Sequence, residues 1–310
     1  MPGKRTFFRR KAALAGSFLF AALAVLLGLP SGPQAVDSKL PRASGPVPSR
    51  IITMAPSITE IVFALGQGHR VAGVSDFCTY PPEALEKPSV GGHLNPNTER
   101  ITVLGPDLVI LQGKSEKTAR FCEKRGIPML FVDMDSIPTI YKGIRTIAKT
   151  LSCVDRGEAL IRDIQARLDE VKKRIAGKKR RSVFICIGRE PGGVASLYTT
   201  GGNSFVSQLV EIAGGDNIFA DVNHPYPEAS KEVLIRRAPE VILDIRLGRD
   251  ISPEQAQKLK AAWKVLRGVP AVENGEIHVL TRDFLLVPGP RVGLATQRFA
   301  EVLHGEEAHE

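Results

Sequence analysis

Two segments far apart in the chain carry the same residue pattern. Residues 97–111 read NTERITVLGPDLVIL, and residues 230–244 read SKEVLIRRAPEVILD. In each, a glutamate lies seven residues before a proline, and the proline is followed by an acid and an aliphatic run. The polar start predicts a capped helix with the glutamate in its first turn, and the aliphatic run predicts a strand. A repeated unit of this kind predicts two similar lobes with a cleft between them, which is a common place for a small-molecule site.

Short apolar runs alternate with helical patterns along the rest of the chain. This alternation favours parallel strands, so we expect two mainly parallel-sheet α/β lobes. A weaker echo of the repeat links SITEIVFALG at 57–66, where Ser57 is the expected N-cap and Gly66 the stop signal, to SFVSQLVEIAGG at 204–215. Strands are predicted at 51–55, 71–76, 107–112, 128–133, 181–188, 241–246 and 276–283.

Residues 137–177 carry one continuous helical pattern between the two halves. Its second part places apolar residues on a single helix face, which is typical of packing against a core. We therefore expect one long helix that joins the lobes stiffly. The apolar residues of this face are Ile161, Ile164, Leu168, Val171 and Ile175.

The N-terminus has a basic stretch, from Lys4 to Lys11, followed by the apolar run AALAGSFLFAALAVLLGL at 12–29. This order is typical of a signal peptide, which we assign to residues 1–35. A retained membrane anchor is the alternative, because the run is close to the roughly 20 apolar residues that span a bilayer. The adjacent Arg9 and Arg10 allow a twin-arginine signal, but the general export route is favoured. Both alternatives place the remaining chain outside the cytoplasm.

Charge and motifs exclude several classes of function. The net charge is +9, but removal of residues 1–35 takes five basic residues and no acidic one, which leaves +4. Nucleic-acid binding thereby loses its main support, since it requires a concentrated basic face. The four cysteines show no metal-binding spacing, and we expect mostly buried thiols. The motifs of common hydrolases and nucleotide-binding enzymes are absent, so a secreted α/β enzyme is only a remote alternative.

Several segments, taken in order, resemble the periplasmic binding proteins of the cobalamin, haem and siderophore importers, and most of all the members that bind cobalamin. The resemblance covers residues 50–303. It implies two α/β lobes joined by a long helix, a shallow cleft with little hinge closure, and delivery of the ligand to an ABC permease rather than catalysis. The segments are IITMAPSITEIVFALG, TYPPEA, NTERITVLGPDLVI, TTGGNSFVSQLVEIAGGDNIFAD, YPEASKEVLIRRAPEVIL and TRDFLLVPGPR.

The resemblance also implies roles for particular residues. One surface acid of each lobe docks onto arginines of the permease, and by motif position these acids are Glu99 and Glu232. Aromatic residues line the ligand cleft, and Tyr80 and Tyr226 fall at such positions, the second where the cobalamin-binding members have a tryptophan. Flat rings offer a corrin macrocycle a large, rigid contact area.

Three further cleft residues are implied near the end of the chain. Asp283 and Phe284, in TRDF, fall in the loop that approaches the ligand from the second lobe. Arg291, at the start of the last helix, either faces the ligand or makes a surface or inter-lobe contact.

His93 departs from the pattern, because the cobalamin-binding members carry a tryptophan there. An imidazole can coordinate cobalt or iron, which favours haem as an alternative ligand, with Tyr80 or Tyr226 as the second axial residue. The other interpretation is an exposed histidine in a turn beside two glycines. His224 has the same ambiguity.

We therefore predict a monomeric, extracytoplasmic receptor without a cofactor of its own. Its transported ligand is cobalamin or another corrinoid, with haem or an iron–siderophore as the alternatives. The predicted parts are a signal peptide (1–35), a flexible leader (36–49), an N-terminal lobe (50–136), a linking helix (137–177), a C-terminal lobe (178–305) and a tail (306–310).

Overall fold

The computed structural model describes residues 46–113, 115–190, 193–194, 196–246 and 251–305. They belong to one compact unit, Ser38–Glu310. The predicted signal peptide at 1–35, most of the predicted leader at 36–49, and the predicted tail at 306–310 lie outside the described residues. No helix in the described part of the chain has both the length and the apolarity needed to cross a membrane.

The N-terminal lobe is built on one parallel sheet. Its elements are β1 (Ile51–Thr53), α1 (Pro56–Ala64), η1 (Gly68–Arg70), β2 (Val71–Val74), η2 (Pro82–Glu86), α2 (Thr98–Leu104), β3 (Leu108–Gln112), α3 (Glu116–Arg125) and β4 (Met129–Val132). The strands lie in the order β2-β1-β3-β4. Strands β1 and β3 are buried along almost their whole length, as expected for a parallel sheet covered on both faces.

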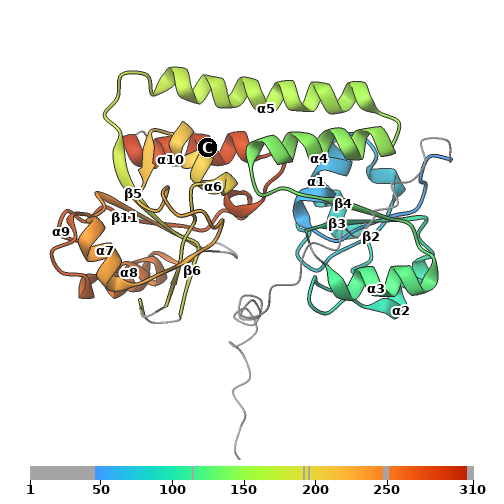
Figure 1. The fold of residues 1–310 in the computed structure, drawn as a ribbon, viewed down its shortest axis with the longest axis horizontal. Coiled ribbons are helices and arrows are strands. Elements are labelled where there is room, and N and C mark those ends of the chain that lie inside the picture. The colour runs from blue at the N-terminus through green and yellow to red at the C-terminus, as the bar shows by residue number, and fades with distance from the viewer. Residues whose placement is uncertain (1–45, 114, 191–192, 195, 247–250, 306–310) are drawn as a thin grey trace, which may run out of the picture. The chain divides into compact units, whose positions relative to one another are not determined.

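The C-terminal lobe has a second parallel sheet, in the order β11-β10-β5-β8, and a small antiparallel sheet, β6-β7-β9. Helices cover the larger sheet (Figure 1). The elements of the C-terminal lobe are β5 (Arg181–Cys186), β6 (Gly188–Arg189), β7 (Leu197–Tyr198), α6 (Phe205–Ile212), β8 (Gly215–Asn217), β9 (Glu228–Ala229), α7 (Lys231–Arg237), β10 (Val241–Ile245), α8 (Pro253–Ala261), η3 (Ala262–Val265), α9 (Pro270–Glu273), β11 (Ile277–Leu280), η4 (Asp283–Leu286) and α10 (Val292–His304).

The two large sheets share one connectivity. In each large sheet, the strand that comes first along the chain lies between the strands that come second and third, and the fourth lies at the far edge. The order β2-β1-β3-β4 thus corresponds to β8-β5-β10-β11. Helices α1 and α6 follow the first strands, and α2 and α7 precede the third. The predicted pair of similar α/β lobes is therefore confirmed.

The repeated helices α2 and α7 begin and end alike. Asn97 accepts a hydrogen bond from the backbone N–H of the third helical residue of α2, and Ser230 does the same for α7. Each helix ends on a residue with left-handed backbone angles, Gly105 at φ 53° and Ala238 at φ 45°. The prediction that each repeated segment begins with a capped helix is confirmed, and the cap of the first helix is Asn97 rather than Thr98, its first residue.

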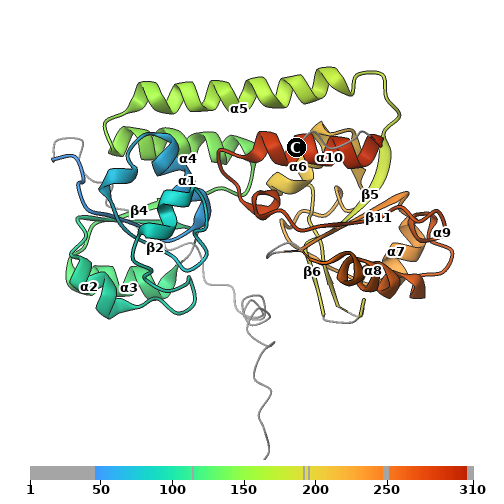
Figure 2. The same ribbon diagram turned by 180° about the vertical axis from the view of Figure 1, so that it is seen from behind.

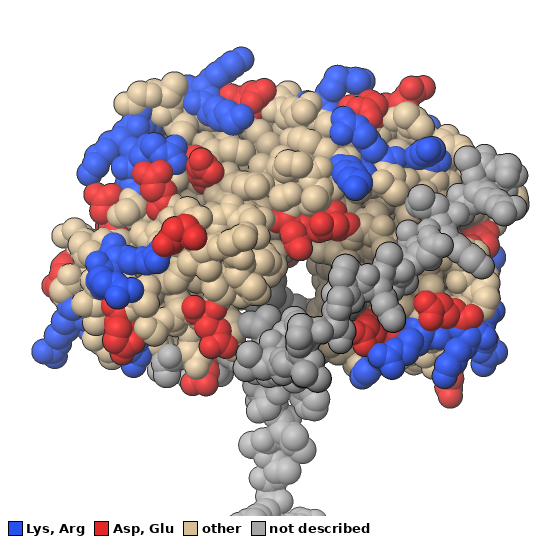
Figure 3. Space-filling model, viewed as in Figure 1, with Lys and Arg blue, Asp and Glu red and all other residues tan. Residues whose placement is uncertain are grey.

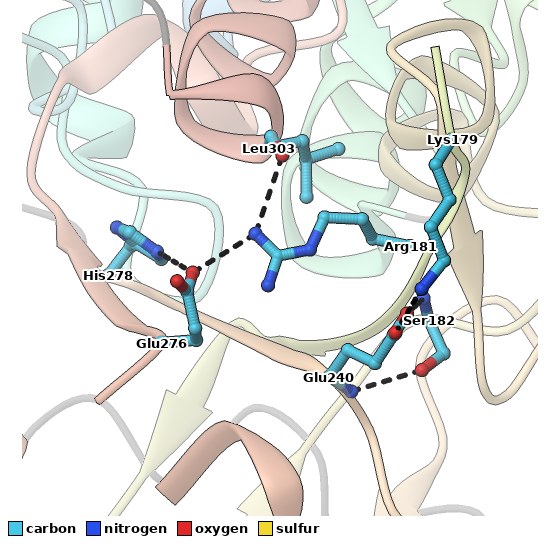
Figure 4. A network of polar contacts seen from close by, with 7 residues as sticks. All are labelled: Lys179, Arg181, Ser182, Glu240, Glu276, His278 and Leu303. Carbon is cyan, nitrogen blue, oxygen red and sulfur yellow. Dashed lines mark hydrogen bonds and ion pairs between the residues drawn. The ribbon is translucent and has the colours of Figure 1, made fainter. Parts of the chain in front are cut away.

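The acid after each repeated proline anchors the neighbouring strand. The carboxylate of Asp107 accepts from the backbone N–H of Arg50 at 2.9 Å, just before β1. In the other lobe, Glu240 accepts from the backbone N–H of Ser182 at 3.0 Å, in β5. The backbone N–H of each acid donates in return to the carbonyl of the same partner, at 3.0 Å in both lobes. Figure 4 shows the Glu240 pair beside Lys179.

The predicted single helix at 137–177 is wrong, because the chain breaks there into α4 (Ile137–Thr150) and α5 (Val154–Arg174). The turn between them has Ser152 at φ 55°, in the left-handed region. The sequence TLSCVD at the break contains no glycine or proline. The break was therefore not predicted, because the helical pattern shows no stop signal there. The two helices pack against each other, and a Cβ at Gly157 would lie only 2.6 Å from the Cβ of Ala148.

Helix α5 carries the chain from the first lobe to the second. It contacts α4 of the first lobe and α10 of the second, and both views show it extended across them (Figures 1 and 2). Its predicted apolar face is confirmed as a core-packing face, since Ile161, Ile164, Leu168 and Val171 are buried. These residues belong to one apolar cluster that includes β-strand residues of both lobes.

An ion-pair network closes the edge of the C-terminal sheet at which its strands begin (Figure 4). Arg181 of β5 donates to Glu276 at 3.1 Å, and Glu276 also pairs with His278 of β11 at 3.2 Å. Burial lowers the pKa of His278, although Glu276 acts in the opposite direction. Arg181 also contacts the carbonyl of Leu303. This network ties two strands and α10 together at the edge opposite to the strand ends that face the cleft.

All four cysteines are free, and Cys78, Cys122 and Cys186 are buried. Burial raises the pKa of Cys186 to about 12 and that of Cys122 to about 11. The expectation of mostly buried thiols is confirmed.

Candidate functional site

A cavity of about 360 Å³ opens where the strands of the N-terminal sheet end. Open α/β sheets bind ligands at this edge. Every strand of the sheet contributes lining residues from the segment that follows it: Pro56 after β1, Phe77 after β2, Gly113 after β3, and Asp133 and Asp135 after β4. The topology thus places two carboxylates and one aromatic ring around a single hollow.

The start of α1 forms one wall of this cavity, and here a sequence prediction is wrong. Ser57 is not the N-cap, because α1 already begins at Pro56 and its N-cap is Ala55, whose methyl side chain cannot accept a hydrogen bond. Proline suits the first helical position, since its missing N–H would have no partner there. The Ser57 hydroxyl instead donates to Gln112 Oε1 at 2.5 Å and so links α1 to the end of β3.

His93 lies in an exposed turn and lines the same cavity. The turn depends on Gly91, at φ 84°, where a Cβ would lie 2.5 Å from the carbonyl oxygen of Asn95. Among the described residues, no group of three or more histidine, cysteine or acidic side chains is placed to hold a metal ion. His93 therefore faces the hollow singly, as one imidazole beside carboxylates.

Tyr226, in the C-terminal lobe, lies within electrostatic range of the same carboxylates. Burial and the charges of Asp135 and Asp133 together raise its pKa to about 12. The phenol consequently stays protonated and can act as a hydrogen-bond donor at neutral pH. Its backbone N–H donates to Nδ1 of the exposed His224 at 3.2 Å, which gives that histidine a role in the loop.

Arg291 joins the two lobes. Its guanidinium donates to both oxygens of Glu60 in α1, at 2.9 and 2.6 Å. It also donates to both oxygens of Asp283 in η4, at 2.9 and 3.1 Å. Of the two interpretations left open by the sequence, the geometry places Arg291 at an inter-lobe contact. Bidentate arginine–carboxylate pairs of this kind are stronger and more directional than a single hydrogen bond.

Tyr80 and Phe284 lie against the same guanidinium, one from each lobe. The Arg291 guanidinium carbon is 4.1 Å from the centroid of the Tyr80 ring and 5.6 Å from that of Phe284. Tyr80 remains 43% exposed. The structure thus brings together four of the residues expected in the cleft, namely Tyr80, Asp283, Phe284 and Arg291.

Three acids of this region were not predicted from the sequence. Glu60 is 3% exposed and lies within the apolar run SITEIVFALG, where a charged residue is itself a signal of a buried partner. Asp133 and Asp135 follow the last strand of the first lobe, at the edge where ligands bind. Burial and the charge of Asp133 raise the pKa of Asp135.

Glu99 and Glu232 lie apart from the cleft residues. Both are exposed, and each occupies the first turn of its helix, α2 or α7. The hydroxyl of Ser230 lowers the pKa of Glu232. The two acids are therefore accessible at equivalent places of the repeat.

Charge is unevenly distributed around the hollow between the lobes. Figure 3 shows acidic side chains on its rim, while the lysine and arginine side chains in that view lie on the outer faces. A hollow with acidic residues and partly exposed rings suits a ligand with N–H donors and flat apolar edges, and it repels a ligand with free carboxylates.

Comparisons with known proteins agree with this geometry. A family model described as periplasmic binding protein matches residues 51–283. The vitamin B12-binding protein of Pectobacterium carotovorum is 29% identical over 83% of this chain and 89% of its own length. The solved vitamin B12 binding protein BtuF of Vibrio cholerae is 27% identical, with a TM-score of 0.68 over 84% of this chain and 98% of that one. The heme-binding protein RhuT of a Roseiflexus species is also 27% identical, with a TM-score of 0.69 over 83% and 98%.

Proposed function

The chain belongs to the periplasmic binding protein family, and we propose that it captures cobalamin or a related corrinoid outside the cytoplasmic membrane and delivers it to an ABC importer. The relatives that bind vitamin B12 support this ligand class. The observation that carries the choice of ligand is the pair of carboxylates, Asp133 and Asp135, that line the cavity.

The charge of this pair distinguishes corrinoids from haem. The edge of cobalamin carries amides, whose N–H groups donate to carboxylates, whereas haem carries propionate carboxylates. A carboxylate brought close to Asp133 and Asp135 meets like charge in a partly desolvated hollow, which opposes binding. An amide at the same place gains hydrogen bonds to charged acceptors.

Haem is the second candidate because His93 lines the cavity and RhuT, at 27% identity, is a heme-binding protein. An imidazole suffices for one axial bond to iron or cobalt. Tyr226 is a poor second axial residue, since burial and the two aspartates raise its pKa to about 12 and oppose the phenolate. The same His93 is compatible with a corrinoid, whose cobalt also accepts imidazole.

Separate titrations of the purified protein with cyanocobalamin, haemin and a ferric hydroxamate test the proposal. We expect saturable binding of cyanocobalamin, measured by calorimetry and by the absorbance of the ligand. Haemin binding without cyanocobalamin binding would overturn the choice of ligand.

A charge-neutral variant adds a test of the reason for this choice. Asp133→Asn with Asp135→Asn should strengthen haemin binding roughly tenfold, because it removes like-charge repulsion. Cyanocobalamin affinity should change less, since asparagine still offers an acceptor oxygen. Asp163→Asn, at an exposed site of α5, is the matched control.

Delivery is proposed to use Glu99 and Glu232, the exposed acids at equivalent places of α2 and α7. Each presents one negative charge for arginines of the permease. Exposed ion pairs contribute only about 0–1 kcal/mol each. Two acids on separate lobes would therefore mainly orient the docked protein and speed its encounter with the permease.

A further inference from the structure

The donors of Arg291 are almost fully used within the protein. A guanidinium has five N–H donors, and four of them bond to Glu60 and Asp283. The side chain of Glu60 is 2% exposed and that of Arg291 is 11% exposed. A ligand in the cleft consequently finds this guanidinium occupied and largely covered.

The faces of the same guanidinium support the two rings expected to receive the ligand. Tyr80 lies at 4.1 Å and Phe284 at 5.6 Å, both within the range of a cation–π contact. The rings come from opposite lobes, Tyr80 after β2 and Phe284 in η4. One group thus touches both rings while their remaining surface stays partly exposed.

The backbone before Arg291 is also held in place. A Cβ at Gly289 would lie 3.5 Å from the Cα of Ser57 and 3.7 Å from Glu60 Oε2, so this loop passes close to the start of α1. Pro288 and Pro290 flank Gly289 and restrict the backbone further. Arg291, the N-cap of α10, is therefore held close to the N-terminal lobe.

From this geometry we infer that Arg291 is a positioning residue, which holds Tyr80 and Phe284 at a set separation across the cleft instead of binding the ligand itself. The inference rests on the proposed function, because it assumes that these rings receive a flat macrocycle. Rings that are ordered before binding lose less conformational freedom when the ligand arrives, and this raises affinity.

A double-mutant cycle on cyanocobalamin affinity tests the link between Arg291 and its ring. Arg291→Lys keeps the positive charge but loses the planar guanidinium that makes the bidentate contacts. We expect it to weaken cyanocobalamin binding roughly tenfold. In a Tyr80→Ala background the same substitution should change affinity less than about twofold, because the ring that it positions is gone. An equal loss in both backgrounds would mean that Arg291 acts on the ligand directly, and an unchanged affinity in the first would also overturn the inference.

A second measurement needs no ligand. Amide hydrogen exchange in the segment around Tyr80 should become about tenfold faster in Arg291→Lys and in Glu60→Gln, while exchange in β1 and β3 stays unchanged. Arg298→Lys, on the same helix but paired with Glu301, is the matched control. Unchanged exchange around Tyr80 would sink the inference even if cyanocobalamin binds. If exchange rises but no corrinoid binds, the positioning role holds and the proposed ligand fails.

Discussion

The two lobes hold each other through equivalent residues of different chemistry. Glu60 in α1 and Gln208 in α6 each lie six residues before a glycine with positive φ, Gly66 at 70° and Gly214 at 87°. Each reaches the start of the helix that follows the last strand of the opposite lobe. Glu60 accepts two hydrogen bonds from Arg291, which precedes α10, whereas Gln208 accepts one, at 2.8 Å, from the backbone N–H of Ile137 in α4.

This difference shows which feature of the inter-lobe contact is common to both lobes and which is not. The repeat preserves the position of the contact, because the same helix points its side chain at the same neighbour in both lobes. It does not preserve charge, since only the Arg291 contact is an ion pair, and only that one touches rings expected to bind ligand. We conclude that the scaffold is shared and that specialised chemistry is added on the side of the cleft.

Truncation of the two equivalent residues should have the largest and most unequal effects. Glu60→Ala leaves the Arg291 charge largely buried beside only one carboxylate, and we expect it to lower the free energy of unfolding by about 3 kcal/mol. Gln208→Ala removes one neutral hydrogen bond, and we expect a loss of about 1 kcal/mol. Urea denaturation followed by circular dichroism measures both. Equal losses would show that the charge adds no stability of its own.

The docking acids test the opposite case, in which the two lobes should behave alike. Glu99→Arg and Glu232→Arg each place a positive charge against permease arginines, and we expect ligand uptake to fall roughly tenfold for either. Affinity for cyanocobalamin should stay within about twofold, because both residues lie outside the cleft. Glu254→Arg, in the first turn of α8, is a matched control outside the repeat. A loss for one lobe only would break the expected symmetry of docking.

Local signals in the sequence were enough to predict the scaffold. The caps Asn97 and Ser230 bond to backbone N–H groups three residues away, so their chemistry can be recognised in one segment. Where the local signal was ambiguous the prediction failed. Ser57 has the chemistry of a cap, but Pro56 before it already begins the helix. The left-handed backbone angle at Ser152 was not predicted, because the residue at that position is not a glycine.

The site could be predicted only in part, because its contacts join distant segments. The resemblance pointed to Tyr80, Phe284 and Arg291, and the structure brings them together. Glu60 was missed, since its partner Arg291 lies 231 residues away. The roles expected of His93 and Tyr226 toward a ligand stay predictions, as do those of Glu99 and Glu232 toward a permease.

The helix ends of the repeat offer a smaller comparison. Gly105 and Ala238 both have left-handed backbone angles, which alanine tolerates less well than glycine. Ala238→Gly should therefore raise the free energy of unfolding by about 1 kcal/mol. Gly105→Ala should lower it by a similar amount, since no atom lies within 4 Å of its added Cβ and only the backbone angle matters. Thermal unfolding of both variants would contradict this account if the two shifts had the same sign.

The strand anchors Asp107 and Glu240 should respond alike to acid. Burial opposes the change at Asp107, but the N–H groups of Ser49 and Arg50 lower its pKa below 3.8. Lys179 and the N–H of Ser182 lower the pKa of Glu240 below 4.5.

A carboxyl group whose pKa is lower in the folded state stabilises the protein above its unfolded value, and this stabilisation is lost as pH falls through the folded value. Asp107→Asn and Glu240→Gln should each lower the free energy of unfolding by at most about 1 kcal/mol at pH 6, because both acids are partly exposed. Each deficit relative to the unaltered protein should shrink as the pH of the urea titration is lowered from 6 toward 3. A deficit that stays constant over this range would mean that the anchors stabilise the strands by shape and hydrogen bonding alone, without their charge.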